Sequence, residues 1–240
     1  MSPRSIELED VRVWREDGLG GQPVEVIHSV GATLGAGRRV AFVGANGAGK
    51  TSLLLALVGA VRFAGRIAFD GIALDRSTLA EHRRSIGYVF AEPSDQLFLP
   101  TVLEEARLAA EQRRLDDPQG RARRALDAVG LVGLDARAPG SLSLGEQRRL
   151  AIATALSGDP GVLLLDEPTA SLDARARRRV LEAMRACPAT TAFATHDLAA
   201  ALELEADVLV LAGGRLVGCG PALEVFRDRA LLDRAELDAP

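Results

Sequence analysis

The sequence contains very little lysine, cysteine, tryptophan or tyrosine. Among its 29 Lys and Arg residues only Lys50 is a lysine, and there are two cysteines, one tryptophan and one tyrosine. Cys187 and Cys219 are far apart and lack metal-ligand spacing, which fits packing roles in a reducing cytosol. No apolar run approaches the roughly 18 residues that span a bilayer, and the alternating segment 6–11 follows the first residues without the apolar stretch of a signal peptide. We therefore expect that any work at a membrane requires another subunit.

The charge balance is mildly acidic, with a net charge of −4 and a pI near 5.5. This argues against a nucleic-acid-binding surface. Two local basic runs, residues 121–124 and 175–179, fall in helix-like segments flanked by acids. We interpret them as solvated helix faces, with a phosphate or partner patch as the alternative.

The order of apolar segments predicts an α/β fold. Short apolar runs at 39–43, 162–165, 190–195 and 207–212 are separated by helical stretches, as is typical of buried parallel strands. The stretch up to about residue 75 is strand-rich, with a strand and turn over 66–71. Without repeats or linkers, residues 1–240 are expected to form one compact domain.

Residues 94–160 are predicted to be mostly helical and to form an insertion in this domain. Thr101 and Glu104 have the spacing of a capping box that opens one helix. A second helix is expected from Gly120 to Val129, ending at Gly130.

The single lysine lies in a glycine-rich segment, Gly44-Ala45-Asn46-Gly47-Ala48-Gly49-Lys50-Thr51. A strand over 39–43 leads into it and an apolar helix over 53–58 follows, which is the context of a phosphate-binding loop. A slender ammonium can reach the β- and γ-phosphates, and the helix N-terminus attracts the anion. The chain is therefore predicted to bind a nucleoside triphosphate. The predicted binding residues are Asn46, Gly47, Ala48, Gly49, Lys50, Thr51 and Ser52, and Thr51 is also a predicted Mg²⁺ ligand.

A second nucleotide signal ends the strand over 162–165. Asp166 and Glu167 follow it, at the edge of the sheet where ligands bind in open α/β proteins. We predict that Asp166 holds Mg²⁺ and that Glu167 orients and polarises an attacking water. Taken alone, the pair is as compatible with a structural ion pair, but the preceding phosphate loop favours catalysis.

A third signal is the segment 143–150, in which Ser143 and Glu146 form a predicted capping box that opens a helix through Leu156. One interpretation is simply a well-capped helix. The other is an anion site, because a serine and Gly145 at a helix N-terminus suit a terminal phosphate.

Together these motifs resemble the ATP-binding-cassette ATPases over essentially the whole chain. The motifs, in the family's order, are the phosphate loop and the segments 142–146, 166–169, 171–173 and 195–197. The segments 94–102 and 214–226 are similar to those of the cobalt/nickel and energy-coupling-factor importers. The resemblance implies a P-loop NTPase cassette: a RecA-like parallel-sheet core, an N-terminal antiparallel β subdomain and an inserted helical subdomain.

The resemblance also implies that two cassettes sandwich two ATP molecules. Ser143, Gly145 and Glu146 would then act on the partner's nucleotide, with the first two at its γ-phosphate. Asp173 would span the dimer interface, and His196 would contact the γ-phosphate and the attacking water. Trp14, the only tryptophan, is a candidate to stack on adenine, with ordinary packing as the alternative.

The chain departs from the family pattern at two positions. At position 91 the family normally has a Gln that touches Mg²⁺ and senses the membrane partner, whereas this chain has Ala91. In the segment 142–146, which is the family's signature motif, Leu144 replaces the first glycine. Glu92 and Gln96 are candidates to substitute for the missing side chain.

The sequence thus predicts an ATP-hydrolysing importer subunit that uses ATP and Mg²⁺. It would work at the cytoplasmic face of the membrane with an integral membrane subunit and a second cassette, and without nucleic acid. The cargo is expected to be cobalt, nickel or another energy-coupling-factor substrate. The alternatives are a transporter of another cargo, such as an amino acid, lipid or drug, and a non-transport ATPase such as an iron–sulfur-assembly component.

Overall fold

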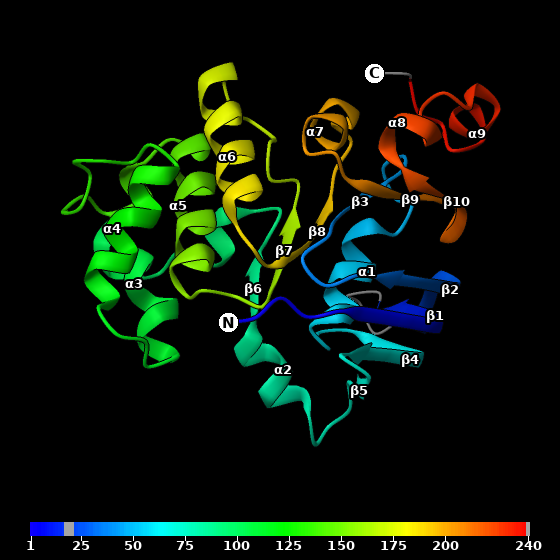
Figure 1. The fold of residues 1–240 in the computed structure, drawn as a ribbon, viewed down its shortest axis with the longest axis horizontal. Helices are drawn as coiled ribbons and strands as arrows, with labels where there is room; N and C mark the ends of the chain where they lie inside the picture. Colours follow the sequence, from blue (N-terminus) through cyan, green and yellow to red (C-terminus); the bar gives the residue numbers. More distant parts are fainter. Residues whose placement is uncertain (17–21, 239–240) are drawn as a thin grey trace.

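The computed structural model describes residues 1–16 and 22–238, which form two sheets with helices around them (Figure 1). The larger sheet has the order β10-β9-β3-β8-β7-β6, in which the strands from β9 to β6 are parallel and β10 is antiparallel at one edge. Its strands are β3 (Arg39–Val43), β6 (Ile86–Val89), β7 (Val162–Asp166), β8 (Thr190–Ala194), β9 (Asp207–Ala212) and β10 (Arg215–Pro221). The predicted parallel-sheet core is confirmed.

The smaller sheet is antiparallel and lies beside the larger one in Figure 1. Its order is β2-β1-β4-β5, from β1 (Ile6–Arg15), β2 (Val24–Leu34), β4 (Arg62–Phe69) and β5 (Ile72–Ala73). A register shift follows Leu8 in β1, where Asp10 has a positive φ of 49°. The N-terminal antiparallel unit that the family resemblance implied is therefore present.

The helices of the described residues are α1 (Lys50–Leu57), α2 (Leu79–Ser85), α3 (Val102–Gln112), α4 (Pro118–Ala128), α5 (Leu144–Ser157), α6 (Ala174–Ala186), α7 (Leu198–Glu203), α8 (Ala222–Val225) and α9 (Arg229–Arg234). Helices α3, α4 and α5 pack together at the β6 end of the larger sheet, opposite the antiparallel sheet (Figure 1). In the part of the chain that is described, no helix has the length and apolarity to cross a bilayer.

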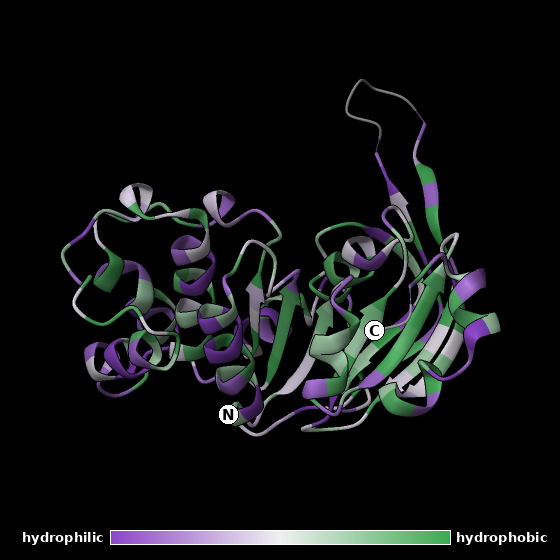
Figure 2. Cartoon of the chain, turned by 90° about the horizontal axis from the view of Figure 1, so that it is seen from above, coloured by the Kyte–Doolittle hydropathy of each residue, from purple (hydrophilic) through white to green (hydrophobic). Residues whose placement is uncertain are grey.

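The core consists of two apolar layers, one on each face of the larger sheet. Along β3, Val40 and Phe42 belong to the layer shared with α1 and the antiparallel sheet, whereas Ala41 and Val43 belong to the layer beneath α5, α6 and α7. This follows from the alternation of side chains along a strand. Figure 2 shows the strands largely green and the outer helices banded with purple, as expected for a sheet that is covered on both faces.

The helices α3, α4 and α5 form where the sequence predicts them, but their first residues and capping hydrogen bonds differ in part from the prediction. The α5 capping box forms in full: the Ser143 hydroxyl accepts from the Glu146 amide, and the Glu146 carboxylate accepts from the Ser143 amide at 2.8 Å. At α3 the Thr101 hydroxyl accepts from the Glu104 amide but donates to the Glu104 carboxylate at 2.7 Å, so only half of the expected box forms. Helix α4 begins at Pro118 rather than Gly120, because Asp117 caps it and proline is favoured in the first turn.

Candidate functional site

The glycine-rich loop connects β3 to α1 and brings backbone amides and the single lysine to one point. Gly49 has a φ of 101°, and a Cβ there would lie 2.5 Å from Ile27 Cδ1, so only glycine fits. Lys50 is 7% exposed, and its Nζ donates to the carbonyl oxygens of Gly44 at 2.7 Å and Ala45 at 3.0 Å. Burial lowers the pKa of Lys50, while the carboxylates of Glu167 and Asp166 act in the opposite direction. The ammonium is therefore held at the loop, near two negative charges.

A cavity of about 240 Å³ opens over this loop and joins the two sheets. Its lining contains Asn46, Gly47, Gly49, Lys50, Thr51 and Ser52 from the loop and α1, Arg15 and Val26 from the antiparallel sheet, Asp166 from the end of β7, and Ala91 and Glu167 from the segments that follow β6 and β7. Two motifs that are separated by more than a hundred residues in the sequence thus meet at one cavity, as the sequence predicted.

Asp166 lies at the end of β7 and is 2% exposed. Burial raises its pKa, opposed by a hydrogen bond from the Thr51 hydroxyl and by the positive charges of Lys50 and Arg148, while Glu167 adds to the increase. A hydroxyl beside a carboxylate at an open cavity is a donor set that suits Mg²⁺ when phosphate oxygens and waters complete the shell. In the described residues, no cluster of three or more His, Cys, Asp or Glu could hold a metal ion.

Glu167 and His196 form a pair at the edge of the cavity. The Nδ1 atom of His196 lies 2.9 Å from Glu167 Oε2, and the histidine side chain is 66% exposed. Glu167 has a left-handed φ of 49°, and its amide donates to the Ala194 carbonyl at 2.9 Å. Backbone strain of this kind persists where neighbouring contacts fix it. The position of the Glu167 carboxylate is thus fixed by the backbone conformation of Glu167, by the hydrogen bond to β8 and by the contact with His196.

The α5 end of the molecule lies apart from this cavity. Ser143, Gly145, Glu146 and Asp173 are not among its lining residues, and Asp173 caps α6 by accepting from the Ala176 amide at 2.7 Å. Within one chain, the structure therefore does not bring these residues to the phosphate loop. Leu144, in place of the family's glycine, is 42% exposed at the same end.

Ala91 lies in the cavity wall without a side chain that could reach a metal. Neither proposed substitute reaches the cavity: Gln96 Oε1 accepts from the Phe90 amide at 2.7 Å, and Glu92 accepts from the Ser94 hydroxyl at 3.2 Å. Gln96 instead shapes the loop that follows β6.

The structure places Trp14 outside the cavity and Arg15 in it. Trp14 lies against Arg62 of β4, whose guanidinium carbon is 5.5 Å from the ring centroid, whereas Arg15 is a lining residue. Adjacent residues of a strand point to opposite faces, and Trp14 is not among the residues that line this cavity. The alternation of Val11 and Val13, both buried, already places Arg15 on the inner face. That signal could have identified Arg15 from the sequence.

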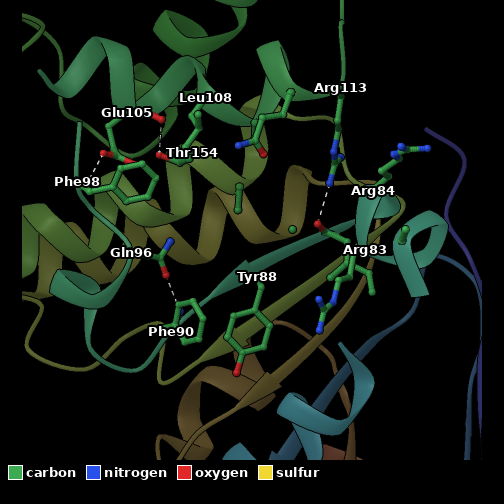
Figure 3. A pocket seen from close by; sticks show the side chains of 16 residues that line it. Arg83, Arg84, Tyr88, Phe90, Gln96, Phe98, Glu105, Leu108, Arg113 and Thr154 are labelled. Atoms are coloured by element: carbon green, nitrogen blue, oxygen red, sulfur yellow. Dashed lines mark hydrogen bonds between the residues drawn. The ribbon is translucent and has the colours of Figure 1, made fainter. Parts of the chain in front are cut away.

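A second, larger groove of about 430 Å³ lies between β6 and α3 (Figure 3). Phe98 is 71% exposed and Phe90 is 39% exposed at this groove. The buried Glu105 carboxylate accepts from the Phe98 amide at 2.9 Å and the Leu99 amide at 2.8 Å, which fixes the loop that carries Phe98. The groove therefore presents aromatic surface one residue away from Ala91.

Comparison with known proteins decides the family. Residues 27–170 match the ABC transporter family model, and the chain is 40% identical to the nickel import ATP-binding protein NikO of Rhodobacter capsulatus over 89% of this chain and 90% of that protein. This chain belongs to the ABC transporter ATPase family. It is also 36% identical to the energy-coupling factor transporter ATP-binding protein EcfA of Methanothermobacter thermautotrophicus, over 98% of this chain and 76% of that protein.

Solved structures agree with this assignment. The ABC ATPase resembles cbiO1 from Clostridium perfringens, described as part of the transporter complex cbiONQ, with a TM-score of 0.78 and 29% identity over 95% of this chain and 92% of that one. It also resembles the dimeric cassette MJ0796 bound to ADP and phosphate, with a TM-score of 0.81 and 25% identity over 90% and 98%. The chain is thus an ATP-binding subunit of an ABC transporter, and its family hydrolyses ATP. The sequence-based assignment to the family is confirmed.

Proposed function

We propose that this ABC ATPase drives an importer for cobalt, nickel or another energy-coupling-factor substrate. The observation that carries the proposal is the near full-length similarity to NikO, EcfA and cbiO1, whose names and title describe nickel import, an energy-coupling factor transporter and the ABC transporter complex cbiONQ. The segments 94–102 and 214–226, which resemble those of such importers in sequence, are consistent with this proposal.

In the proposed reaction, the loop amides and Lys50 hold the phosphates of ATP, and Thr51 and Asp166 hold Mg²⁺. When bound, Mg²⁺ would neutralise charge on the phosphate oxygens. Glu167 accepts a proton from the attacking water, and His196, 2.9 Å away, holds the carboxylate in place and contacts the γ-phosphate. Asn46, Gly47, Ala48, Gly49 and Ser52 complete the phosphate cradle.

A second cassette would complete each site. Ser143, Gly145, Glu146 and Asp173 lie away from their own chain's cavity, which supports a role at the nucleotide of a partner cassette. ATP binding would then close the dimer and hydrolysis would reopen it.

The membrane subunit would dock in the groove of Figure 3, and this chain would lie at the cytoplasmic face of the membrane. Exposed aromatic side chains are the anchors that protein interfaces favour. A segment seated between Phe90 and Phe98 would also touch the loop that leads to Ala91, so docking would be felt at the nucleotide cavity.

The proposal is tested by isolating the membrane complex that contains this chain and measuring which metal it retains. We expect a multi-spanning membrane protein to co-purify, and cobalt or nickel to be retained. Recovery of the chain without any membrane protein would contradict the transport role, and retention of an organic cargo alone would contradict the metal assignment.

A matched pair of variants tests the docking groove in the same preparation. Phe98→Ser should reduce co-purification severalfold, while Val132→Ser, which removes an equally exposed apolar side chain outside the groove, should not. Both variants should still bind ATP. Equal recovery of the membrane protein with both would contradict docking at this groove.

A further inference from the structure

We propose that Arg148 is a positioning residue that couples the two nucleotide sites of the dimer by tying α5 to the backbone of Glu167 and Ala91. This inference rests on the proposed dimer. Through Arg148, a movement of α5 would be transmitted to the residue that carries the catalytic carboxylate, Glu167 of the same chain.

The geometry of Arg148 is unusual for an arginine on a helix. The residue is 4% exposed, its Nη1 donates to the Glu167 carbonyl and its Nη2 to the Ala91 carbonyl, both at 2.8 Å. Its Nε is buried without a hydrogen-bond partner among the described residues. One planar fork therefore holds the two backbone segments that form the catalytic side of the cavity.

Such an arrangement is costly to maintain, which argues against a purely incidental contact. Burial lowers the pKa of Arg148, opposed by the negative charges of Glu92, Glu167 and Asp166. A buried guanidinium with an unsatisfied Nε costs free energy that an apolar side chain at this position would avoid. The bond to the Glu167 carbonyl also restrains the residue whose backbone is in the left-handed region.

Arg148 lies on the same rigid helix as Ser143, about 7–8 Å along the helix axis from it. In the proposed dimer, the Ser143 end of α5 contacts the nucleotide of the partner cassette. A shift of α5 on closure would pull or release the Glu167 and Ala91 carbonyls through Arg148. Ala91 has no polar side chain that could connect this segment to α5. The hydrogen bond from Arg148 to its backbone carbonyl makes that connection instead.

Arg149 offers a matched control on the same helix. It donates through Nη1 to the carbonyls of Val129 and Gly130, both at 2.9 Å, and through Nε to the Gly145 carbonyl of its own helix at 3.3 Å. It therefore fixes the end of α4 and has no hydrogen bond to the backbone of Glu167 or Ala91. Replacing either arginine by lysine keeps the charge and loses the planar fork.

The test compares steady-state ATP hydrolysis by the wild type, Arg148→Lys and Arg149→Lys, each checked by urea unfolding. For Arg148→Lys we expect kcat to fall about tenfold or more, KM for ATP to change less than about twofold, and the Hill coefficient for ATP to fall toward one. Arg149→Lys should lower the resistance to urea while kcat and the Hill coefficient stay near wild type. Arg148→Met serves only as a second variant without the charge.

The proposal is overturned if Arg148→Lys retains the wild-type kcat and Hill coefficient. It is also overturned if both lysine variants lose activity in proportion to their loss of stability, since a merely structural role predicts that result. Failure of the dimer itself is distinguished separately: a wild type that hydrolyses ATP without cooperativity and without MgATP-dependent dimerisation would remove the proposed dimer on which the coupling rests.

Discussion

Arg15 and Trp14, neighbours on β1, have opposite relations to the nucleotide cavity. Arg15 and Val26 line its end in the antiparallel sheet, while Asp166 and Glu167 line the other end. With the phosphates on the loop, the base would lie toward Arg15. A guanidinium can stack on the face of a purine as it does on aromatic side chains.

The single tryptophan makes this placement measurable by fluorescence. Because Trp14 packs against Arg62, saturating MgATP should change its emission only slightly. In a Trp14→Phe variant that also carries Arg15→Trp, the same titration should quench the emission strongly. Arg15→Ala should raise KM for ATP about fivefold, consistent with loss of roughly 1 kcal/mol. Strong quenching in the wild type would instead place Trp14 at the base.

The alanine at position 91 should slow catalysis without preventing binding. A water can replace a missing ligand on Mg²⁺, but it is held less firmly than a side chain. Ala91→Gln should therefore raise the hydrolysis rate severalfold, because the side chain would extend into the cavity that Ala91 lines. Steady-state rates of both proteins, measured side by side, check this. A fast wild type that the added Gln leaves unchanged would show that another group supplies the contact.

At the scale of secondary-structure elements, one arginine of α6 contacts both ends of α7. Arg177 contacts Asp197 through Nε at 2.8 Å and Nη2 at 3.2 Å, and Glu203 through Nη1 at 2.6 Å. The basic run 175–179 is thus not only a solvated helix face. Burial acts to raise the pKa of Asp197, but hydrogen bonds from Arg177, the Ala200 amide and Thr169 outweigh it and lower the pKa.

This ion pair should make stability depend on pH in the acid range. Since the folded-state pKa of Asp197 lies below its ordinary value, the stabilisation is present above about pH 4 and is lost as the pH falls through the folded-state pKa. Asp197→Asn should lower the free energy of unfolding by about 1–2 kcal/mol at pH 7. Urea unfolding at pH 7 and at lower pH checks this: the difference from wild type should shrink on acidification, and a difference that stays constant would contradict the assignment.

The elements that the sequence predicted best are those set by local patterns. The bounds of β3 and β9 agree with the apolar runs 39–43 and 207–212, and the α5 capping box forms as its residue types require. The loop between β6 and α3 was not predicted in detail, because its course depends on side-chain contacts with the backbone, such as those of Glu105 with the amides of Phe98 and Leu99. No periodicity in a sequence encodes such contacts.

The candidate site shows the same division between local and distant information. Glycine and lysine spacing predicted the loop, and the cavity indeed joins it to Asp166 and Glu167. The hydrogen bonds from Arg148 to the carbonyls of Glu167 and Ala91 could not be predicted, since they depend on how α5 packs against the ends of β6 and β7. Arg15 was missed although the alternation along β1 contained the signal.

At the scale of the whole molecule, two sheets meet at a nucleotide cavity, and helix α5 lines the groove of Figure 3 with Thr154 and Ala155 and begins at the capping residue Ser143. Nucleotide, partner cassette and membrane subunit would therefore act on connected parts of one fold. The central claim is that Glu167 activates the water in a dimer closed by ATP.

Steady-state ATP hydrolysis by Glu167→Gln, with ATP binding and dimer formation measured in the same preparation, tests this claim most directly. The substitution preserves shape and removes the proton acceptor, so hydrolysis should fall at least about a hundredfold while ATP still binds. The unreacted ATP should accumulate a closed dimer in the presence of Mg²⁺. Near-normal turnover in Glu167→Gln would contradict the account, because the catalytic carboxylate would then lie elsewhere.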